Sequence, residues 1–445
     1  RSTLFPYTTL FRSSYLALIL SITACSSDSD YEIPSNTDPV VEDNELRSIS
    51  LTPSEQQLVT NGNDFAFNLF RQVSDEKASI VLSPISITYA LGMLNNGADG
   101  ETLKQINKVL GFSSADEVND FCKKMLTEAP KLDQLTKVLI ANTIFMNKDY
   151  VLKTSFVQKA NDYYNAQPET RDFGDGKTLD VINQWASDHT EKMIDKVLDA
   201  DTFDPNAVSY LLNAIYFKGA WTAKFDKSET KDEEFQTDGE QANPKVPMMH
   251  QQKTFNYTET EDYQVVCLPY GNEAYNMTIL LPCEEKTVSQ VLSGLTADNW
   301  AKMQKKLAGT RVDVKLPRFE SKTDINLIEI MNQLGMPNAF LYDKAEFPNF
   351  CNKPTFINLM KQVAKIKLDE EGTEAAAVTI IGTNVACGPE GGSSLITFHA
   401  NRPYRQPEEH PYYPYLYHYH YYHPYHHHYH NHHYLPLHLI LQLQS

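Results

Sequence analysis

The most informative pattern of the chain spans eleven residues, Asp369-Glu370-Glu371-Gly372-Thr373-Glu374-Ala375-Ala376-Ala377-Val378-Thr379. With a period of two, one face holds only small side chains, namely Thr373, Ala375, Ala377 and Thr379. The opposite face holds Gly372, Glu374, Ala376 and Val378. As a strand, the segment can bury its first face between existing strands while Glu374 stays in solvent. It is therefore predicted to enter a sheet or to lie outside as a flexible loop. A short surface helix is the alternative, because Ala and Glu favour helices.

Helical patterns precede this segment in the chain. Helices are expected from Pro53 onward, over residues 84–96, between Asp99 and Gly111, over Lys153–Asn165 and over Thr178–Leu198. Ser83 and Pro84 form an N-terminal cap for the second of these helices. This helix is apolar nearly all round and so should be buried.

Strand patterns are interspersed with the helices. β-branched and apolar runs predict strands at Val138–Met146, Val208–Phe217, Tyr263–Pro269, Tyr275–Pro282, Val312–Pro317 and Lys361–Leu368. Gly271-Asn272 predicts a hairpin turn between the third and fourth of these strands. Because strands and helices mix without strict βαβ alternation, we expect an α+β fold.

Composition and charge exclude several classes of protein. The 445 residues include 57 acidic and 39 basic ones, a formal charge of -18. Nucleic acid is therefore not expected as a partner, because little positive charge is available to neutralise phosphates. No apolar run reaches the length of a membrane-spanning helix. The six cysteines form no CxxC pair, which argues against a zinc site or a disulfide framework.

The sequence holds no convincing catalytic motif. GxSxG, HExxH and GxGxxG are absent, and Gly176-Lys177-Thr178 lacks the first glycine of a phosphate-binding loop, where Arg171 stands. Outside the C-terminal tail the histidines are His189, His250 and His399, each isolated in sequence. No serine has the context of a nucleophile. We therefore expect a protein that is not an enzyme and needs no cofactor or metal, with His189 solvated or hydrogen-bonded.

The N-terminal region is expected to lie outside the folded domain. We interpret residues 1–24 as a foreign or misread start followed by the remnant of a bacterial lipoprotein signal. Its short apolar end precedes Cys25, whose thiol we expect to carry lipid, with an ordinary secretory signal as the alternative. Residues 25–50 are polar and acidic and are expected to form a flexible tether. The expected location is extracellular or at the cell surface, lipid-anchored to the outer membrane, with the periplasm as the alternative.

The C-terminal region differs in composition from the rest. Tyr404–Ser445 holds 11 of the 14 histidines and 11 of the 25 tyrosines, interleaved with proline, which marks low complexity. Imidazoles bind transition metals well, so a metal-binding tail is one interpretation. We favour the other, in which residues 405–445 are translated out of frame and contribute no core strand.

Residues 370–379, called the hinge below, and a series of motifs before them resemble the serpins, in family order. The motifs are Leu82-Ser83-Pro84-Ile85-Ser86-Ile87, Ala90–Leu94, Asn96–Thr102, Ala141–Phe145, Asn183-Gln184-Trp185, Asn213–Trp221, Val246–Met249, Leu268-Pro269-Tyr270, Leu316–Phe319, Leu334-Gly335-Met336 and Glu370–Ala377. The expected serpin domain covers residues 51–404. Phe398–Pro403 also matches, but the family then continues with two core strands. The tail lacks an alternating apolar pattern in that place, which is why we favour the out-of-frame interpretation.

The resemblance implies three β-sheets, eight to nine helices and an exposed reactive loop, in a monomer. A protease cleaves the loop, and the freed loop inserts into the central sheet and traps the acyl-enzyme. The resemblance assigns the hinge to Glu370–Thr379 and the core that opens on insertion to Ser83, Ser86 and Asn213. A non-inhibitory binding protein of the same fold is the rival, although it has no need of small alternating hinge residues.

Two ways of counting place the scissile bond differently. Counted from the hinge it lies near Ala386-Cys387, and counted back from Phe398 it lies near Gly392-Ser393. The candidate residues are Val385, Ala386, Cys387, Gly388, Gly392 and Ser393. In the alternative, Cys387 and the glycines after it only add length to the loop and do not contact the protease. No Lys or Arg lies between Gly372 and Asn401, so trypsin-like targets are not expected. The aliphatic and small residues predict elastase-like or subtilisin-like targets, with papain-like proteases next.

Overall fold

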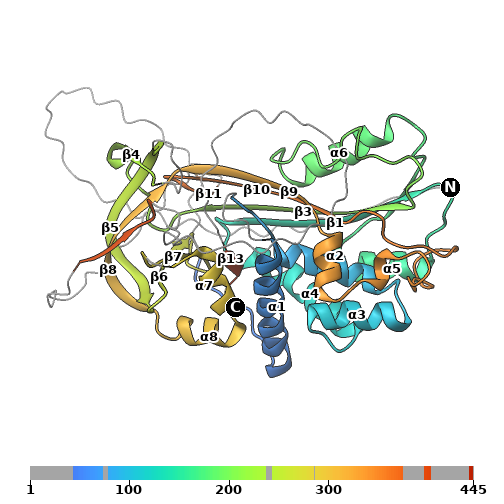
Figure 1. Ribbon diagram of the computed structural model, residues 1–445, viewed down its shortest axis with the longest axis horizontal. Coiled ribbons are helices and arrows are strands. Elements are labelled where there is room, and N and C mark those ends of the chain that lie inside the picture. The colour runs from blue at the N-terminus through green and yellow to red at the C-terminus, as the bar shows by residue number, and fades with distance from the viewer. Residues whose placement is uncertain are drawn as a thin grey trace, which may run out of the picture. The chain divides into compact units, whose positions relative to one another are not determined.

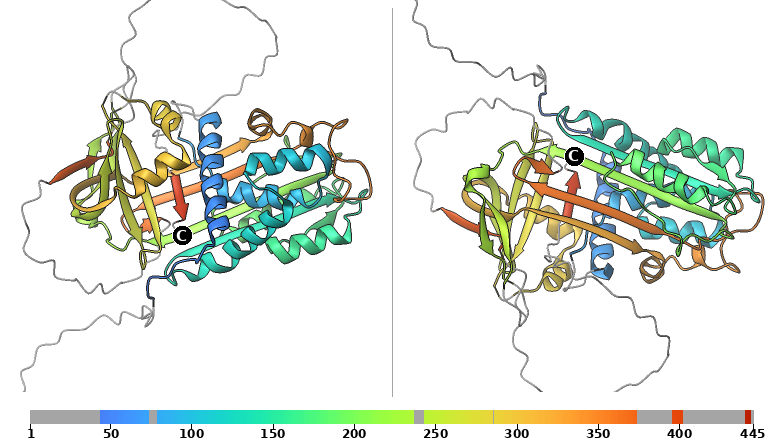
Figure 2. Two further views of the ribbon diagram at one scale, coloured as in Figure 1. Left: turned by 90° about the horizontal axis from the view of Figure 1, so that it is seen from below. Right: turned by 90° about the horizontal axis from the view of Figure 1, so that it is seen from above.

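The computed structural model describes residues 44–73, 79–236, 243–284, 286–373, 395–401 and 440–443, the last segment by its backbone alone. All of them belong to the unit Val40–Ser445. These residues form nine α-helices and two β-sheets (Figures 1 and 2). None of the helices in the described ranges is long and apolar enough to cross a membrane.

The first three helices begin at or next to the residues that the sequence predicts, and six more follow along the described chain. They are α1 Pro53–Val73, α2 Pro84–Asn95, α3 Gly100–Leu110, α4 Ala115–Glu128, α5 Thr154–Tyr164, α6 Thr178–His189, α7 Val288–Gly294, α8 Ala297–Gln304 and α9 Ile328–Leu334. Ser83 caps α2, and its Oγ accepts a hydrogen bond from the Ser86 amide nitrogen at 3.4 Å. Nearly all of α2 is buried, as its apolar pattern predicts.

The expected helix over Thr178–Leu198 is wrong in its second half, because α6 ends at His189. The Thr190 side chain takes part in the turn that follows, donating to the Ala186 carbonyl at 2.8 Å. Glu191 and Lys192 then have φ values of 50° and 65°. These left-handed conformations are incompatible with a continuing α-helix.

The first sheet has six strands in the order β2-β1-β3-β11-β10-β9. Their bounds are β1 Lys137–Asn147, β2 Glu169–Arg171, β3 Ser209–Ala220, β9 Phe319–Asn326, β10 Lys361–Asp369 and β11 Gly372–Thr373. Helices α1 to α5 lie on one side of this sheet and α6 lies on the other (Figure 1). Phe145 and Leu212 of the sheet pack with Ile182 of α6 in a separate apolar cluster.

The second sheet has seven strands, in the order β12-β8-β5-β6-β7-β13 with β4 beside β5. Their bounds are β4 Lys231–Glu234, β5 Lys245–Glu259, β6 Tyr263–Tyr270, β7 Tyr275–Pro282, β8 Ala308–Pro317, β12 Ile396–His399 and β13 Ile440–Leu443. The sequence leads us to expect three sheets. The described strands form two, because the long β5 pairs with β4, β8 and β6 and so joins two groups of strands.

The flexible tether expected over residues 25–50 includes residues that the structure places in the folded domain. Ile49 is buried in the core. The Asn44 side-chain amide donates to Asp133 at 2.7 Å, and the Asn44 side-chain oxygen accepts from the Gln134 amide nitrogen. The described part of the N-terminal region, residues 44–50, therefore belongs to the folded domain.

Residues 405–445 are expected to contribute no core strand, and within them the structure describes the backbone of one four-residue strand, β13. Leu441 pairs with Met277 and Leu443 with Tyr275, antiparallel along the free edge of β7. Leucine occupies every second position from Leu435 to Leu443, which is a strand pattern that the description of the tail as non-alternating overlooks.

Candidate functional site

The hinge enters the first sheet at β11, between β3 and β10. Thr373 pairs with Gly219 on one side and with Leu368 on the other, antiparallel to both strands. Gly372 is required there, because a Cβ at this position would lie 2.0 Å from the Gly219 carbonyl oxygen. The strand interpretation of the hinge is thus confirmed for its two described strand residues, in preference to a surface helix.

Thr373 is only 1% exposed, as expected for the small face of the segment. Its hydroxyl lies 2.5 Å from the hydroxyl of Tyr270 in β6. Trp221 stacks on the Tyr270 ring with centroids 4.4 Å apart, and its indole nitrogen donates to the Asp369 carbonyl at 3.0 Å. Burial raises the pKa of Tyr270, so its hydroxyl remains a neutral hydrogen-bonding group.

The two acidic residues before Gly372 hold the hinge in place. Glu370 is 2% exposed; its carboxylate accepts from the Thr230 hydroxyl at 2.8 Å and faces Arg318 at 3.5 Å. Glu371 pairs with Lys224 at 2.8 Å and with Lys227 at 3.0 Å. Hydrogen bonds from these lysines hold the pKa of the Glu371 carboxyl below its ordinary value, so it is ionised at neutral pH.

β3 and β10 are both longer than the strand between them. β11 ends at Thr373, whereas β3 extends back to Ser209 and β10 to Lys361. The two long strands meet near their N-terminal ends through a bridge between Leu211 and Met360. Among the described strands, none lies between β3 and β10 from the end of β11 to this bridge.

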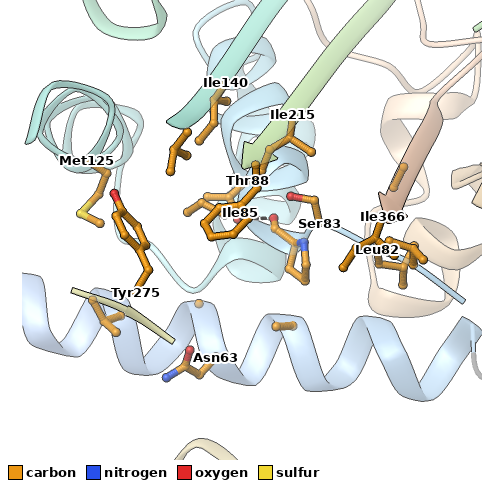
Figure 3. A pocket seen from close by; sticks show the side chains of 18 of the residues that line it. Asn63, Leu82, Ser83, Ile85, Thr88, Met125, Ile140, Ile215, Tyr275 and Ile366 are labelled. Carbon is orange, nitrogen blue, oxygen red and sulfur yellow. Dashed lines mark hydrogen bonds between the residues drawn. The ribbon is translucent and has the colours of Figure 1, made fainter. Parts of the chain in front are cut away.

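An apolar cavity of about 200 Å³ lies on the inner side of this region (Figure 3). On the sheet side it is lined by Ile215 and Phe217 of β3, Ala364 and Ile366 of β10, and Thr373. On the helix side it is lined by α1 and by the start of α2, including Asn63, Ser83, Ile85 and Thr88. Because strand residues two apart share a face, the sheet-side residues all lie on the face of Thr373.

The structure brings together two of the three residues assigned to the opening core. The Ser83 hydroxyl lies 2.8 Å from that of Ser86. Asn213 lies elsewhere on β3 and donates to Asn142 at 2.7 Å. Gln362 of β10 is the partner that the sequence reasoning missed: its side chain accepts from the Ser83 amide at 3.0 Å and donates to the Ser83 carbonyl at 3.1 Å.

Several candidate residues lie outside the described part of the chain. They are Cys25, Glu374, Ala375, Ala376, Ala377, Val378, Thr379, Val385, Ala386, Cys387, Gly388, Gly392 and Ser393. His189 is described, and its Nδ1 lies 2.7 Å from the Trp185 carbonyl, which fits the expected hydrogen-bonded role. No group of three or more possible metal ligands occurs among the described residues.

Comparison with known proteins identifies the family. The family profile described as Serpin (serine protease inhibitor) matches residues 60–405. The chain belongs to the serpin family. The serpin fold expected from the sequence is thereby confirmed, and the description of the matching profile is that of a serine protease inhibitor.

Individual serpins match most of this serpin's length. Human Serpin B3 is 31% identical over 364 residues, which cover 76% of this chain and 92% of that protein. The native structure of Tengpin, a thermophilic serpin, has a TM-score of 0.71 and 31% identity, covering 80% of this chain and 92% of that chain. Tengpin in the latent state matches with a TM-score of 0.68 and 31% identity, covering 73% and 88% of the two chains.

Proposed function

We propose that this serpin is an irreversible protease inhibitor, which traps the acyl-enzyme by inserting its cleaved loop between β3 and β10. The observation that carries the proposal is the position of Thr373. It is buried between these two strands, and in the sequence it directly precedes Glu374 and the three alanines of the hinge. Insertion then extends an existing strand, and each added residue can pair with backbone groups on both sides.

The register of β11 fits the small residues of the hinge to the cavity. Continued in the same register, Ala375 falls between Phe217 and Ile366, and Ala377 falls between Ile215 and Ala364. These four neighbours line the cavity. Methyl side chains fill space there without clashing with the core.

The opposite face of the same register accommodates the charged residue of the hinge. Glu374 falls between Lys218 and Lys367, one on each flanking strand. Neither lysine lines the apolar cavity. Opposite charges on neighbouring strands stabilise a sheet by about 0.2–1 kcal/mol per pair. Glu374 therefore fits the inserted strand at its solvent face.

Full insertion requires β3 and β10 to separate at their far ends. The bridge between Leu211 and Met360 must open, and it lies close in sequence to Gln362, which holds Ser83. Each backbone hydrogen bond contributes only about 1 kcal/mol net, so a long inserted strand is needed to drive the change. A long inserted strand must have small side chains on its buried face along its whole length, which is the pattern of the hinge sequence.

The proposed targets follow from the residues around the two candidate scissile bonds. Val385 and Ala386 suit shallow apolar pockets, which supports elastase-like or subtilisin-like serine proteases and then papain-like enzymes. A binding protein without inhibitory activity remains the second candidate. The two candidates differ in outcome, because a protease would cut the binding protein without becoming trapped.

The proposed location rests on the sequence of the N-terminal region alone. Cys25 is the proposed lipid attachment site of a bacterial lipoprotein, on the cell surface or, as the alternative, facing the periplasm. The inhibitor domain would then meet proteases near the membrane, and would contact the membrane only through the lipid.

The experiment that tests the function mixes the purified protein with pancreatic elastase and analyses the products under denaturing conditions. An inhibitor gives a covalent complex that contains the protease and the serpin up to the scissile bond, because the part of the chain after this bond leaves as the amine and separates under denaturing conditions. Complete cleavage of the chain with no complex, for elastase, subtilisin and papain alike, contradicts the proposal and favours the binding protein.

A further inference from the structure

The cavity between the first sheet and α1 is large enough to hold a small organic molecule. Its volume is about 200 Å³, whereas an engineered apolar cavity of about 150 Å³ in another protein binds benzene. Most of its lining is aliphatic or aromatic, and residues from six different parts of the fold contribute, among them Leu58, Val81, Phe112, Met125, Ile140 and Ile366. The space therefore has the size and the surface that suit an apolar ligand.

The walls of the cavity are held by the packing of the core. In Figure 3, α1 forms one wall and the strands that carry Ile140 and Ile215 face it, whereas Met125 and Tyr275 lie at one end and Leu82 and Ile366 at the other. The residues at both ends are buried members of the main hydrophobic cluster. Elements that are distant in sequence thus enclose one space.

The hydroxyl groups in the described lining already have hydrogen-bond partners within the protein. The hydroxyls of Ser83 and Thr88 bond within α2 and its cap, at 2.8 and 3.1 Å. The Tyr275 hydroxyl donates to a backbone carbonyl, and the hydroxyl of Thr373 is bound by Tyr270. A ligand in the cavity is therefore not needed to satisfy any of these groups.

The other polar groups of the described lining are paired as well. The Lys365 ammonium lies 2.7 Å from Glu320, and the Asn276 amide donates to the Glu273 carbonyl at 3.3 Å. Of the described buried side-chain atoms that lack a hydrogen-bond partner, none belongs to a residue that lines the cavity. A buried water needs about two to four polar partners, so water gains little by entering this space.

We propose that this cavity is a binding site for a small uncharged apolar molecule, of the size of a substituted benzene ring or somewhat larger. Binding removes the ligand's apolar surface from water and fills a space where water finds few partners. A charged molecule does not fit, because the ammonium of Lys365 is already paired with Glu320 and a buried charge without a partner is costly. The site goes beyond the proposed inhibition, since binding requires neither the reactive loop nor a protease.

Two alanines allow the cavity to be filled from opposite sides. Ala66 lines it on the side of α1, and Ala364 lines it on the side of β10. Leucine at either position would extend into the cavity and occupy space that a ligand needs. Leucine is also a good helix former, so Ala66→Leu is compatible with α1.

The experiment titrates the uncleaved full-length protein with toluene by calorimetry and follows its thermal unfolding. Toluene should bind with a one-to-one stoichiometry, and the midpoint of unfolding should rise with its concentration, because the ligand binds the folded state. Benzoate has the same ring but carries a carboxylate, and it should bind about a hundredfold more weakly or not at all.

The variants test whether toluene binds in this cavity. Ala66→Leu and Ala364→Leu should each weaken toluene binding about tenfold or more. Ala301→Leu is the matched control, since Ala301 is an exposed alanine of α8 outside the described lining, and its binding should be unchanged. Thermal unfolding without ligand verifies that each variant is folded. If Ala364→Leu does not fold, Ala66→Leu and its control carry the test.

Three outcomes would overturn the proposal. Absence of saturable toluene binding excludes the site, and equal binding by Ala66→Leu and the unsubstituted protein places the ligand elsewhere. Benzoate binding as tight as that of toluene contradicts the uncharged class of ligand. None of these measurements uses a protease, so a failure of the proposed inhibition leaves them intact.

Discussion

The hydroxyl of Tyr270 lies 2.5 Å from the hydroxyl of Thr373, so a side chain of the seven-stranded sheet binds the hinge strand of the six-stranded sheet. Trp221, stacked on the Tyr270 ring, fixes the direction of that hydroxyl and also binds the Asp369 carbonyl. Insertion extends the strand from Thr373 onward. The hydrogen bond therefore holds the residue at which the moving and fixed parts of the sheet meet.

Tyr270→Phe should lower the free energy of unfolding by about 1–3 kcal/mol, because the buried Thr373 hydroxyl loses its Tyr270 partner. Denaturant titration of the uncleaved protein measures this loss. Tyr342→Phe is the control, since Tyr342 is 71% exposed and should tolerate the change. Equal stability of Tyr270→Phe and the unsubstituted protein would contradict the importance of this bond.

Thr373→Arg should turn the inhibitor into a substrate. The substitution places an unpaired charge at a site that is 1% exposed, which costs several kcal/mol and opposes extension of β11. Insertion is then slower than hydrolysis of the acyl-enzyme. The measurement is the ratio of cleaved chain to covalent complex on a denaturing gel with elastase.

Thr373→Val is the matched control for this substitution. Valine has the shape of threonine and carries no charge, but it removes the hydroxyl that binds Tyr270. It should keep most of the trapping while losing stability. If Thr373→Arg forms as much complex as Thr373→Val, burial of this face is not needed for trapping.

Glu371→Gln should destabilise the native state by about 1 kcal/mol at pH 7, because both lysine ion pairs lose their carboxylate. The pKa of Glu371 is lowered in the folded protein, so its contribution is present above the ordinary glutamate pKa and is lost as pH falls through the lowered one. The melting temperatures of the two proteins should therefore converge on acidification. A difference that stays constant from pH 7 down to about pH 3 would contradict this ion-pair role.

The hinge shows what the sequence can predict about this fold. The alternation of small residues around Thr373 is a local pattern, and its strand interpretation holds at the two described strand residues, Gly372 and Thr373, where Thr373 is buried. The end of α6 is also local in cause, but the left-handed conformations of Glu191 and Lys192 leave no signature in residue type. Propensity alone therefore extends the helix too far.

The contacts between distant residues were beyond local patterns. Asp313 lies 63 residues from His250 and 86 from His399 in sequence, yet its carboxylate contacts both imidazoles. The pairing of β8 with β5 and β12 brings these three side chains together. Gln362 reaches Ser83 across 279 residues in the same way. Alternating residues predict which face of a strand is buried, whereas sheet register decides which side chains meet.

Cys25 should be the lipidated first residue of the mature protein. The short apolar run before it ends in Thr23 and Ala24, small residues of the kind that precede a lipoprotein cleavage site. Intact-mass measurement of the membrane fraction should show a chain that begins at Cys25 with an added lipid mass. Cys25→Ser should shift the protein to the soluble fraction, and a soluble unsubstituted protein cleaved elsewhere would exclude the anchor.

The choice of protease should follow the absence of Lys and Arg between Gly372 and Asn401. A trypsin-like pocket selects a cation through a buried carboxylate, and this loop offers it no such partner. Elastase-like and subtilisin-like enzymes accept small and aliphatic side chains, which Val385 and Ala386 provide. Complex formation with elastase should release a C-terminal fragment that begins between residues 386 and 393, as measured by mass spectrometry. Ala386→Arg, the matched variant, should become a better substrate for trypsin. Tight inhibition of trypsin by the unsubstituted protein would overturn this assignment of targets.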